Sequence, residues 1–101
     1  MKYNVYLIPS AQKDFKNLDG REKLLVAKQL KKLTVNPFSG EALGKKAGID
    51  LTGHYKLYAD KKRLRIVYRC RGENIDVEIM AIGKRENFEV YQSAEERKHE
   101  Q

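Results

Sequence analysis

Residues 54–72 read H-Y-K-L-Y-A-D-K-K-R-L-R-I-V-Y-R-C-R-G and predict two β-strands joined by a turn at Lys61 and Lys62. Apolar and charged side chains alternate along much of this stretch, which is the pattern of a half-buried strand. Seven Lys and Arg residues and a single Asp lie within it, so it holds +6 of the formal net charge of +7. Basic residues interleaved with Leu64 and Ile66 belong to a folded surface rather than to a tail. Such a surface most often faces phosphate.

The face on which each side chain lies follows from strand alternation. In the strand over 63–70, the odd positions carry most of the cations and the even positions carry Leu64, Ile66, Tyr68 and Cys70. In a third predicted strand, over 74–82, the residues expected to face the core are Ile75, Val77, Ile79 and Ala81. The other face of the sheet is expected to carry Lys56, Tyr58, Arg63, Arg65 and Arg69. Such a face can bind phosphates and stack bases. The alternative is a solvated face on which Asp76 and Glu78 pair with the arginines.

The first part of the chain predicts a strand and a helix. Residues 3–8 are rich in β-branched and aromatic side chains, and Pro9 closes this strand. Ser10 suits the N-cap of a short helix that runs to about Leu18. Asp19 and Gly20 then break this helix.

A second helix follows, and with it the fold class can be predicted. Asp19 suits its N-cap, Glu22 completes a capping box, and the Asn-Pro pair at 36–37 ends it. Adding a short helix over 88–98 gives the order β-α-α-β-β-β-α. We therefore predict an α+β fold with an N-terminal strand, a helical hairpin, a largely antiparallel sheet of about four strands and a short C-terminal helix.

Length and composition exclude several classes of protein. A chain of 101 residues predicts one domain, over 1–101. No stretch approaches the ~20 apolar residues of a membrane span, so no membrane partner is expected. Cys70 is the only cysteine, which rules out an internal disulfide and favours a cytoplasmic location. No metal-ligand spacing and no glycine-rich phosphate loop occurs, so the sequence predicts neither metal nor cofactor.

The segments Y-K-L (55–57), R-L-R-I-V-Y (63–68) and G-K-R-E-N-F-E-V-Y (83–91), with N-P-F-S-G-E-A-L-G (36–44) before them, resemble the RelE/ParE toxin superfamily, specifically its RelE-like branch. The resemblance extends over nearly the whole chain, and its most specific part is residues 83–91. It implies a type II toxin that cleaves mRNA in the ribosomal A site and is neutralised by a cognate RelB-like antitoxin. The implied partners are therefore mRNA, the rRNA of the A site and an antitoxin, in a toxin–antitoxin hetero-oligomer.

The same resemblance implies which residues act. Matching the motifs of the family gives the catalytic set Lys56, Arg65, Arg85 and Tyr91. The RNA-binding set inferred from the basic surface is Tyr58, Lys61, Lys62, Arg63, Arg69 and Lys84. The chain departs from the family at Tyr58, where the best-known member has a second lysine, so one positive charge is missing.

The implied chemistry is metal-free attack of a ribose 2′-hydroxyl on its own phosphate. Arg65 and Arg85 suit stabilisation of the phosphorane, because guanidinium groups match phosphate oxygens. Lys56 can act as a second cation or, if neighbouring cations lower its pKa, as a general base. Tyr91 can orient the 2′-hydroxyl, accept from it or stack on a base, or it can simply pack on the sheet.

Two other functions remain open on sequence grounds. A ParE-like inhibitor of DNA gyrase would use similar strands without cleaving RNA, and a non-catalytic RNA-binding module would need only the basic face. His54 is an alternative base, although a sheet-edge position without a catalytic role is favoured. His99 lies in the polar terminus E-E-R-K-H-E-Q and is expected to be solvated.

Overall fold

The computed structural model describes residues 2–46, 48–84 and 89–100. Its three helices are α1 (Pro9–Lys16), α2 (Gly20–Leu33) and α3 (Glu89–Glu96). Its strands are β1 (Val5–Leu7), β2 (Glu41–Ala42), β3 (Lys45–Lys46), β4 (Ile49–Asp50), β5 (His54–Ala59), β6 (Leu64–Arg71) and β7 (Asp76–Lys84). The predicted bounds of β5 are confirmed, and those of β6 and β7 shift by one or two residues.

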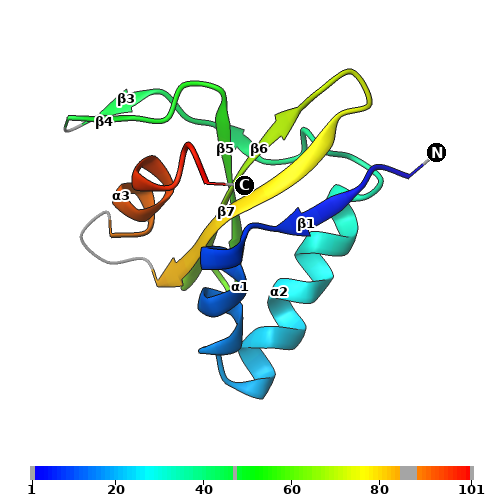
Figure 1. The fold of residues 1–101 in the computed structure, drawn as a ribbon. Coiled ribbons are helices and arrows are strands. Elements are labelled where there is room, and N and C mark those ends of the chain that lie inside the picture. Colours follow the sequence, from blue (N-terminus) through cyan, green and yellow to red (C-terminus); the bar gives the residue numbers. More distant parts are fainter. Residues whose placement is uncertain (1, 47, 85–88, 101) are drawn as a thin grey trace.

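Five of the strands form the central sheet, in the order β1-β7-β6-β5-β2. β1 runs parallel to β7, and the other neighbours are antiparallel. Helix α1 packs on β7 and α2 on β5, whereas α3 crosses β6 and β7 on the opposite side of the sheet (Figure 1). The predicted α+β class and helical hairpin are thus confirmed. The fifth strand is the short β2, which the glycine-rich loop adds at the edge.

The two N-terminal helices begin differently from each other. The predicted N-cap at Ser10 is wrong, because α1 begins at Pro9 and Ile8 occupies the cap position without a side-chain hydrogen bond. Proline suits the first helical position, since its missing N–H would have no partner there. In α2 the predicted capping box is present: the Glu22 amide donates to Asp19 Oδ1 at 2.7 Å, and the Asp19 amide donates to Glu22 Oε1 at 3.0 Å.

An irregularity in the pairing of β6 with β7 changes which side chains face the hairpin. Val67 pairs with Ala81, but the next residue, Tyr68, pairs with Ile79, so Met80 is the extra residue of a bulge. Ala81 is buried in the core as predicted, but not on the side of the sheet that faces the helical hairpin. It lies opposite Val67 on the face of Arg65, and the residues on both sides of it are also buried.

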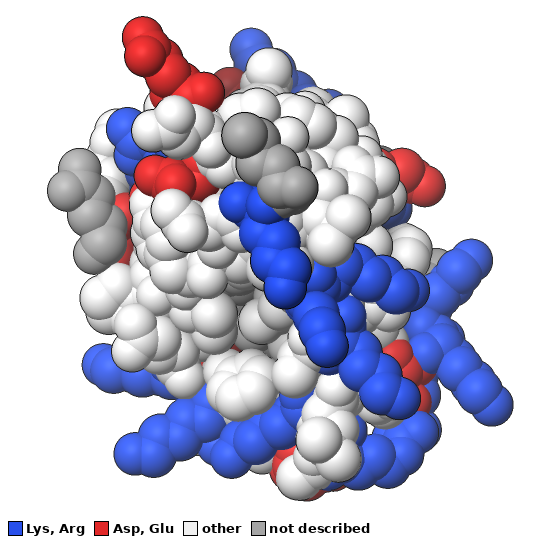
Figure 2. All heavy atoms as spheres, turned by 90° about the vertical axis from the view of Figure 1, so that its right-hand side faces the viewer, with Lys and Arg blue, Asp and Glu red and all other residues white. Residues whose placement is uncertain are grey.

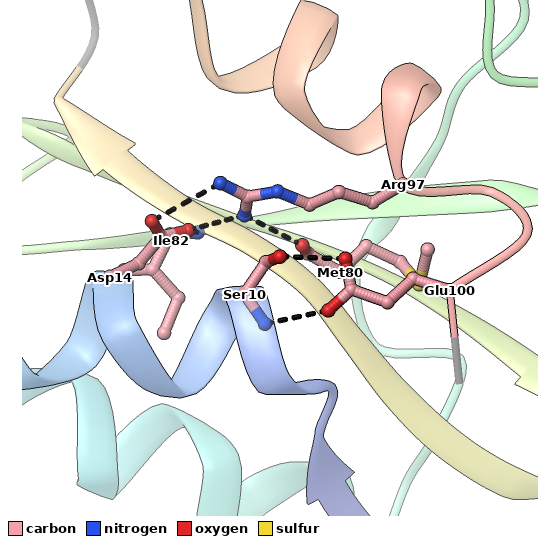
Figure 3. A network of polar contacts seen from close by, with 6 residues as sticks. All are labelled: Ser10, Asp14, Met80, Ile82, Arg97 and Glu100. Carbon is pink, nitrogen blue, oxygen red and sulfur yellow. Dashed lines mark hydrogen bonds and ion pairs between the residues drawn. The ribbon is translucent and has the colours of Figure 1, made fainter.

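The segment after α3 ties that helix to α1 across the part of β7 that lies beyond its pairing with β1 (Figure 3). Arg97 donates to Asp14 Oδ2 at 2.6 Å and to the Met80 carbonyl at 3.0 Å. Glu100 accepts from the Ser10 hydroxyl at 2.6 Å and from the Ser10 amide at 2.7 Å. The segment after α3 is therefore part of the packed structure, while His99, which was expected to be solvated, is exposed. We call this set of contacts the C-terminal clamp.

Positive charge extends beyond the sheet. Figure 2 views the side of the molecule that lies to the right in Figure 1, and Lys and Arg side chains project from its lower and right-hand parts with few acidic neighbours. Lys28, Lys31 and Lys32 of α2 are exposed. Within residues 2–46, 48–84 and 89–100, no helix has the length and apolar character needed to cross a membrane.

Candidate functional site

A pocket of about 280 Å³ opens on the sheet face that carries α3. Its floor and one wall come from Lys56 of β5, Arg65 of β6 and Tyr91 of α3. The other wall consists of residues 41–45 with Ile49 and Leu51. Three of the four residues predicted to be catalytic thus line one pocket. The fourth, Arg85, lies outside the residues that the structure describes.

Lys56 stays charged in this pocket. Its Nζ lies 3.1 Å from Tyr58 Oη and 3.3 Å from Glu41 Oε2. The hydrogen bond to Tyr58, followed by that to Glu41, raises the pKa of Lys56 and outweighs the opposing effect of burial. The pKa of Lys56 is therefore raised in the free protein, whereas the general-base alternative requires it to be lowered. Lys56 is a cation and a proton donor here.

Arg65 is placed between two aromatic rings. Its guanidinium carbon lies 5.6 Å from the ring centroid of Tyr58 and 4.9 Å from that of Tyr91. Both distances are within the range of a cation–π contact, about 6 Å. Arg65 Nε is buried and has no hydrogen-bond partner among the described residues. The contacts fix the orientation of the fork and leave hydrogen-bonding capacity for an anion.

Tyr91 comes to the site from the first turns of α3. Tyr91 is 8% exposed, and its helix neighbours Val90 and Ala94 are buried against the sheet. Burial raises the pKa of Tyr91, although the charges of Arg65 and Lys56 oppose the shift. The phenol therefore keeps its proton at neutral pH, and its hydroxyl can donate to a developing negative charge.

The loop that leads into β2 is positioned by a close backbone approach. The Gly40 amide donates to Tyr68 Oη at 2.9 Å. A Cβ at Gly40 would lie 2.5 Å from the Lys56 carbonyl and 2.6 Å from Tyr68 Oη, so only glycine fits. Tyr68 is held in turn by stacking on Tyr55, with centroids 5.5 Å apart. This arrangement brings the next residue, Glu41, opposite Lys56 in the β2–β5 pairing.

Glu41 is the functional candidate that sequence reasoning missed. It is the only carboxylate lining the pocket among the described residues, and its side chain is 75% exposed. Nothing in its own motif indicates a pairing with Lys56, because the contact depends on the register of β2 against β5. The pocket therefore combines a carboxylate, three cations (Lys45, Lys56 and Arg65) and a buried phenol.

The predicted RNA-binding residues separate into two groups. Tyr58 lies beside the pocket and contacts two of its lining residues, Lys56 and Arg65. Another hollow, bordered also by Asp19 and Glu22, is lined by Lys61, Lys62, Arg63 and Lys84. Lys62 connects the two places, since its Nζ lies 5.7 Å from the ring centroid of Tyr58.

Arg69 is placed apart from both groups. Its Nε donates to Glu78 Oε1 at 2.7 Å, and its Nη1 donates to the Lys98 carbonyl at 2.6 Å. Only 12% of the side chain is exposed. The sequence leaves open that Glu78 pairs with the arginines of this face, and Arg69 does form that pair.

His54 does not face the pocket of Lys56 and Arg65. It is 5% exposed and lies opposite Arg69 in the β5–β6 pairing. Burial, together with the charges of Arg69 and Lys98, lowers its pKa, so the ring is neutral at pH 7. No group of three or more His, Cys, Asp or Glu side chains suited to a metal ion occurs in the described part of the chain.

Two sequence comparisons find proteins related to this chain. Residues 5–94 match the family model of the ParE-like toxin of type II bacterial toxin–antitoxin systems. A protein of Escherichia coli named as a candidate RelE-like toxin is 35% identical over 97 residues, which cover 96% of this chain and 98% of that protein.

Solved structures share the fold. A double mutant of the Escherichia coli toxin RelE in the free state superposes with a TM-score of 0.75 at 24% identity, covering 96% of this chain and 98% of that one. The same mutant in complex with a peptide of the antitoxin RelBc has a TM-score of 0.69 at 24% identity, covering 93% and 95%. At this level of identity the similarity shows the fold.

Proposed function

Because this chain belongs to the ParE-like toxin family of type II bacterial toxin–antitoxin systems, we propose that it is a RelE-like mRNA endoribonuclease that acts in the ribosomal A site. The observation that carries the proposal is the pocket in which Lys56, Arg65 and Tyr91 converge. Two cations and a protonated phenol that converge in one pocket match the charge that develops on a phosphate under attack. Residues 1–101 form one toxin domain in this account, and it acts in the cytoplasm.

The proposed reaction is transesterification within the RNA strand. The ribose 2′-oxygen attacks the adjacent phosphorus, the bond from phosphorus to the 5′-oxygen breaks, and the products carry a 2′,3′-cyclic phosphate and a 5′-hydroxyl. Arg65 binds two oxygens of the phosphorane with its fork, and the Tyr91 hydroxyl donates to the same charge. Arg85, which the family motif assigns to the site, adds a further cation.

Glu41 and Lys56 move the protons in this proposal. Glu41 accepts the proton of the 2′-hydroxyl, and the Lys56 ammonium gives a proton to the leaving 5′-oxygen. Because the two side chains are 3.3 Å apart, the proton gained by Glu41 can restore the charge of Lys56. The raised pKa of Lys56 suits a group that must be protonated at the start of each cycle.

The proposed RNA contacts extend from the pocket across the turn between β5 and β6. Tyr58 offers a ring for stacking, and the cations that can follow the backbone are Lys61, Lys62, Arg63 and Lys84. These residues contribute binding rather than chemistry. Codon-registered cutting then follows from presentation of the mRNA by the ribosome.

Neutralisation by a RelB-like antitoxin is part of the same proposal. An acidic segment that folds on binding suits the Lys56 and Arg65 surface and would exclude RNA from it. Support comes from the relative of similar fold that was solved in complex with a peptide of its antitoxin. A structure of the toxin–antitoxin pair in which this surface stays open would contradict the assignment.

Primer extension on a reporter mRNA in a purified translation system tests the activity. We expect cuts that depend on ribosomes and on this protein, and a loss of about 10²- to 10³-fold in R65Q. E41Q should also be slow, because an amide cannot accept the proton. K28Q is the matched control, since Lys28 is an exposed cation on α2, away from the pocket.

The outcome also separates the alternatives. Growth arrest in cells without cuts in the purified system would indicate another target, such as DNA gyrase. RNA binding without cleavage and without growth arrest would indicate the non-catalytic module.

A further inference from the structure

A second hollow lies on the same sheet face as the pocket, at the other end of β5 and β6. It has a volume of about 380 Å³. His54 and Arg69, which are paired in the β5–β6 register, form its floor, whereas Lys56 and Arg65 line the first pocket. Lys98, from the segment after α3, closes one side, and Arg71 and His99 also line it. We call it the His54 hollow.

Donors in the His54 hollow are left without partners. Arg69 Nη2 is buried and makes no hydrogen bond within the described residues, although Nε and Nη1 of the same fork are engaged. Both ring nitrogens of His54 are buried and also lack a partner there. Backbone groups of Leu51 and Thr52 lie close enough to the His54 ring to favour its charged form. Their geometry does not meet the criteria for a hydrogen bond to either ring nitrogen.

Buried donors without partners are rare in folded proteins, because each one loses its hydration without replacement. A neutral imidazole still presents one N–H and the Arg69 fork presents another, so one acceptor group can satisfy both. An anion suits this position, because the Lys98 ammonium and the Arg71 guanidinium line the same hollow and outnumber the Asp50 carboxylate. These donors lie on the floor and sides of the hollow.

Two carboxylates oppose an anion here, and both are already engaged. Glu78 accepts hydrogen bonds from Arg69 Nε and, at 3.2 Å, from Tyr6 Oη. Its Oε1 also lies 3.8 Å from Arg71 Nη1. Asp50 accepts from the Thr52 hydroxyl at 2.8 Å and from the Thr52 amide at 3.1 Å. Neither accepts from Arg69 Nη2 or His54, so the free donors remain available to a ligand.

From this arrangement we infer that the His54 hollow is a second anion site that binds a phosphate group through Arg69, His54 and Lys98. A phosphate oxyanion has acceptors in several directions, which matches a guanidinium, an imidazole and an ammonium. The phosphate belongs either to a nucleic-acid backbone or to free phosphate. Its assignment to the RNA backbone rests on the proposed function, whereas binding of the ion does not.

Titration with inorganic phosphate tests the site directly. The chain has two histidines, His54 and His99. The ring NMR signal that remains in the H99Q variant is therefore that of His54, which assigns both signals of the full-length protein. At constant ionic strength against chloride, we expect a saturable shift of the His54 ring. In K98A the apparent Kd should rise at least fivefold, while in K28A it should not change. The K98A exchange keeps the backbone carbonyl that accepts from Arg69.

Absence of a saturable His54 shift, or the same curve for K98A and the wild type, would overturn the site. If K98A fails to fold, H54Q monitored by phosphate NMR line broadening replaces it, with the same expected weakening. Because this assay contains no RNA and no ribosome, its result is independent of whether the protein cleaves mRNA.

A non-cleavable 2′-O-methyl oligonucleotide then identifies the source of the phosphate. Its affinity is measured by fluorescence anisotropy over a series of salt concentrations. If the phosphate is part of a strand, K98A should lower the slope of log K against log salt by about 0.7, the value for one phosphate of a single strand. An unchanged slope with intact binding of inorganic phosphate assigns the site to the free ion.

Discussion

The guanidinium of Arg65 lies against the ring of Tyr91, with 4.9 Å between its carbon and the ring centroid. Arg65 belongs to β6, and Tyr91 belongs to a helix that follows it by about 25 residues in the sequence. The pocket therefore exists only when α3 lies on the sheet. Function and the packing of the C-terminal segment are thus coupled through this contact.

Substitutions of Tyr91 separate its two contributions. Y91F keeps the ring on Arg65 but removes the hydroxyl, and we expect the rate of cleavage to fall about 10- to 100-fold with little change in RNA affinity. Y91A removes the ring as well, so both rate and affinity should fall. Single-turnover cleavage and binding of the non-cleavable oligonucleotide give the two quantities. Equal rates for Y91F and the wild type would remove the phenol from the chemistry.

The C-terminal clamp should contribute to stability as well as to activity. Asp14 and Arg97 are both about one-fifth exposed, and R97M removes hydrogen bonds to a charged group and to the Met80 carbonyl. We expect a loss of about 1–3 kcal/mol in the free energy of unfolding, measured by urea denaturation. Cleavage should fall in parallel, because Tyr91 is no longer held over Arg65.

Arg21 provides the matched control for that experiment. It pairs with Asp60 in a bidentate contact, in which the Arg21 side chain is 63% exposed and the Asp60 side chain is 5% exposed. Because solvent reaches the guanidinium, the pair contributes less than a buried one, and within the described residues R21M removes no hydrogen bond to the backbone. R21M should therefore be less destabilised than R97M and should keep its activity. A larger loss for R21M would show that the clamp is not the stronger of the two contacts.

Gly40 is expected to be irreplaceable for a steric reason. In G40A the new methyl group would overlap the Lys56 carbonyl and Tyr68 Oη, and we expect a cost of about 1–3 kcal/mol in unfolding free energy. Gly44 is the control, because a Cβ there meets no atom within 4 Å. G44A should lie within about 0.5 kcal/mol of the wild type. Equal stability of the two variants would show that the loop adjusts.

The buried His54 predicts a pH dependence of stability. Its pKa is lowered in the folded protein, whereas in the unfolded chain it has the usual value of about 6.5. Below that pH the unfolded state binds a proton that the folded state excludes. The free energy of unfolding therefore falls as the pH drops through about 6.5, and the loss stops growing below the folded-state pKa.

Urea denaturation of H54Q and H99Q between pH 7.5 and 5 measures this contribution. The H99Q curve should keep the wild-type slope near pH 6, because His99 is exposed, and H54Q should lose part of it. A buffer without phosphate or sulfate is required, since either anion would favour the charged ring. Parallel curves for the two variants would contradict the burial of a neutral His54.

Much of the fold was accessible from the sequence because its signals are local. Alternation gave β5 and β6, and the Asp19–Glu22 pair gave the start of α2. The bulge at Met80 was not predictable, because β7 is apolar on both faces and alternation carries no information there. The polar residues after α3 look solvated in isolation, and only the folded chain brings Arg97 to Asp14.

The site divides in the same way. Family motifs indicated Lys56, Arg65 and Tyr91, and the structure places these three in one pocket, while their catalytic roles remain predictions. Glu41 was missed because its partner depends on the pairing of two distant segments. The charge of Lys56 was also not predictable, since it depends on that carboxylate and on Tyr58 rather than on the neighbouring cations.

The most direct test is single-turnover cleavage of a 5′-labelled mRNA held on purified ribosomes, comparing the wild type with R65Q and K28Q. The proposal predicts codon-registered products with 2′,3′-cyclic phosphate ends for the wild type and K28Q, and a rate at least about 10²-fold lower for R65Q. Cleavage by R65Q at the wild-type rate, or no cleavage by any of the three proteins, would contradict the assignment of this pocket as the nuclease site.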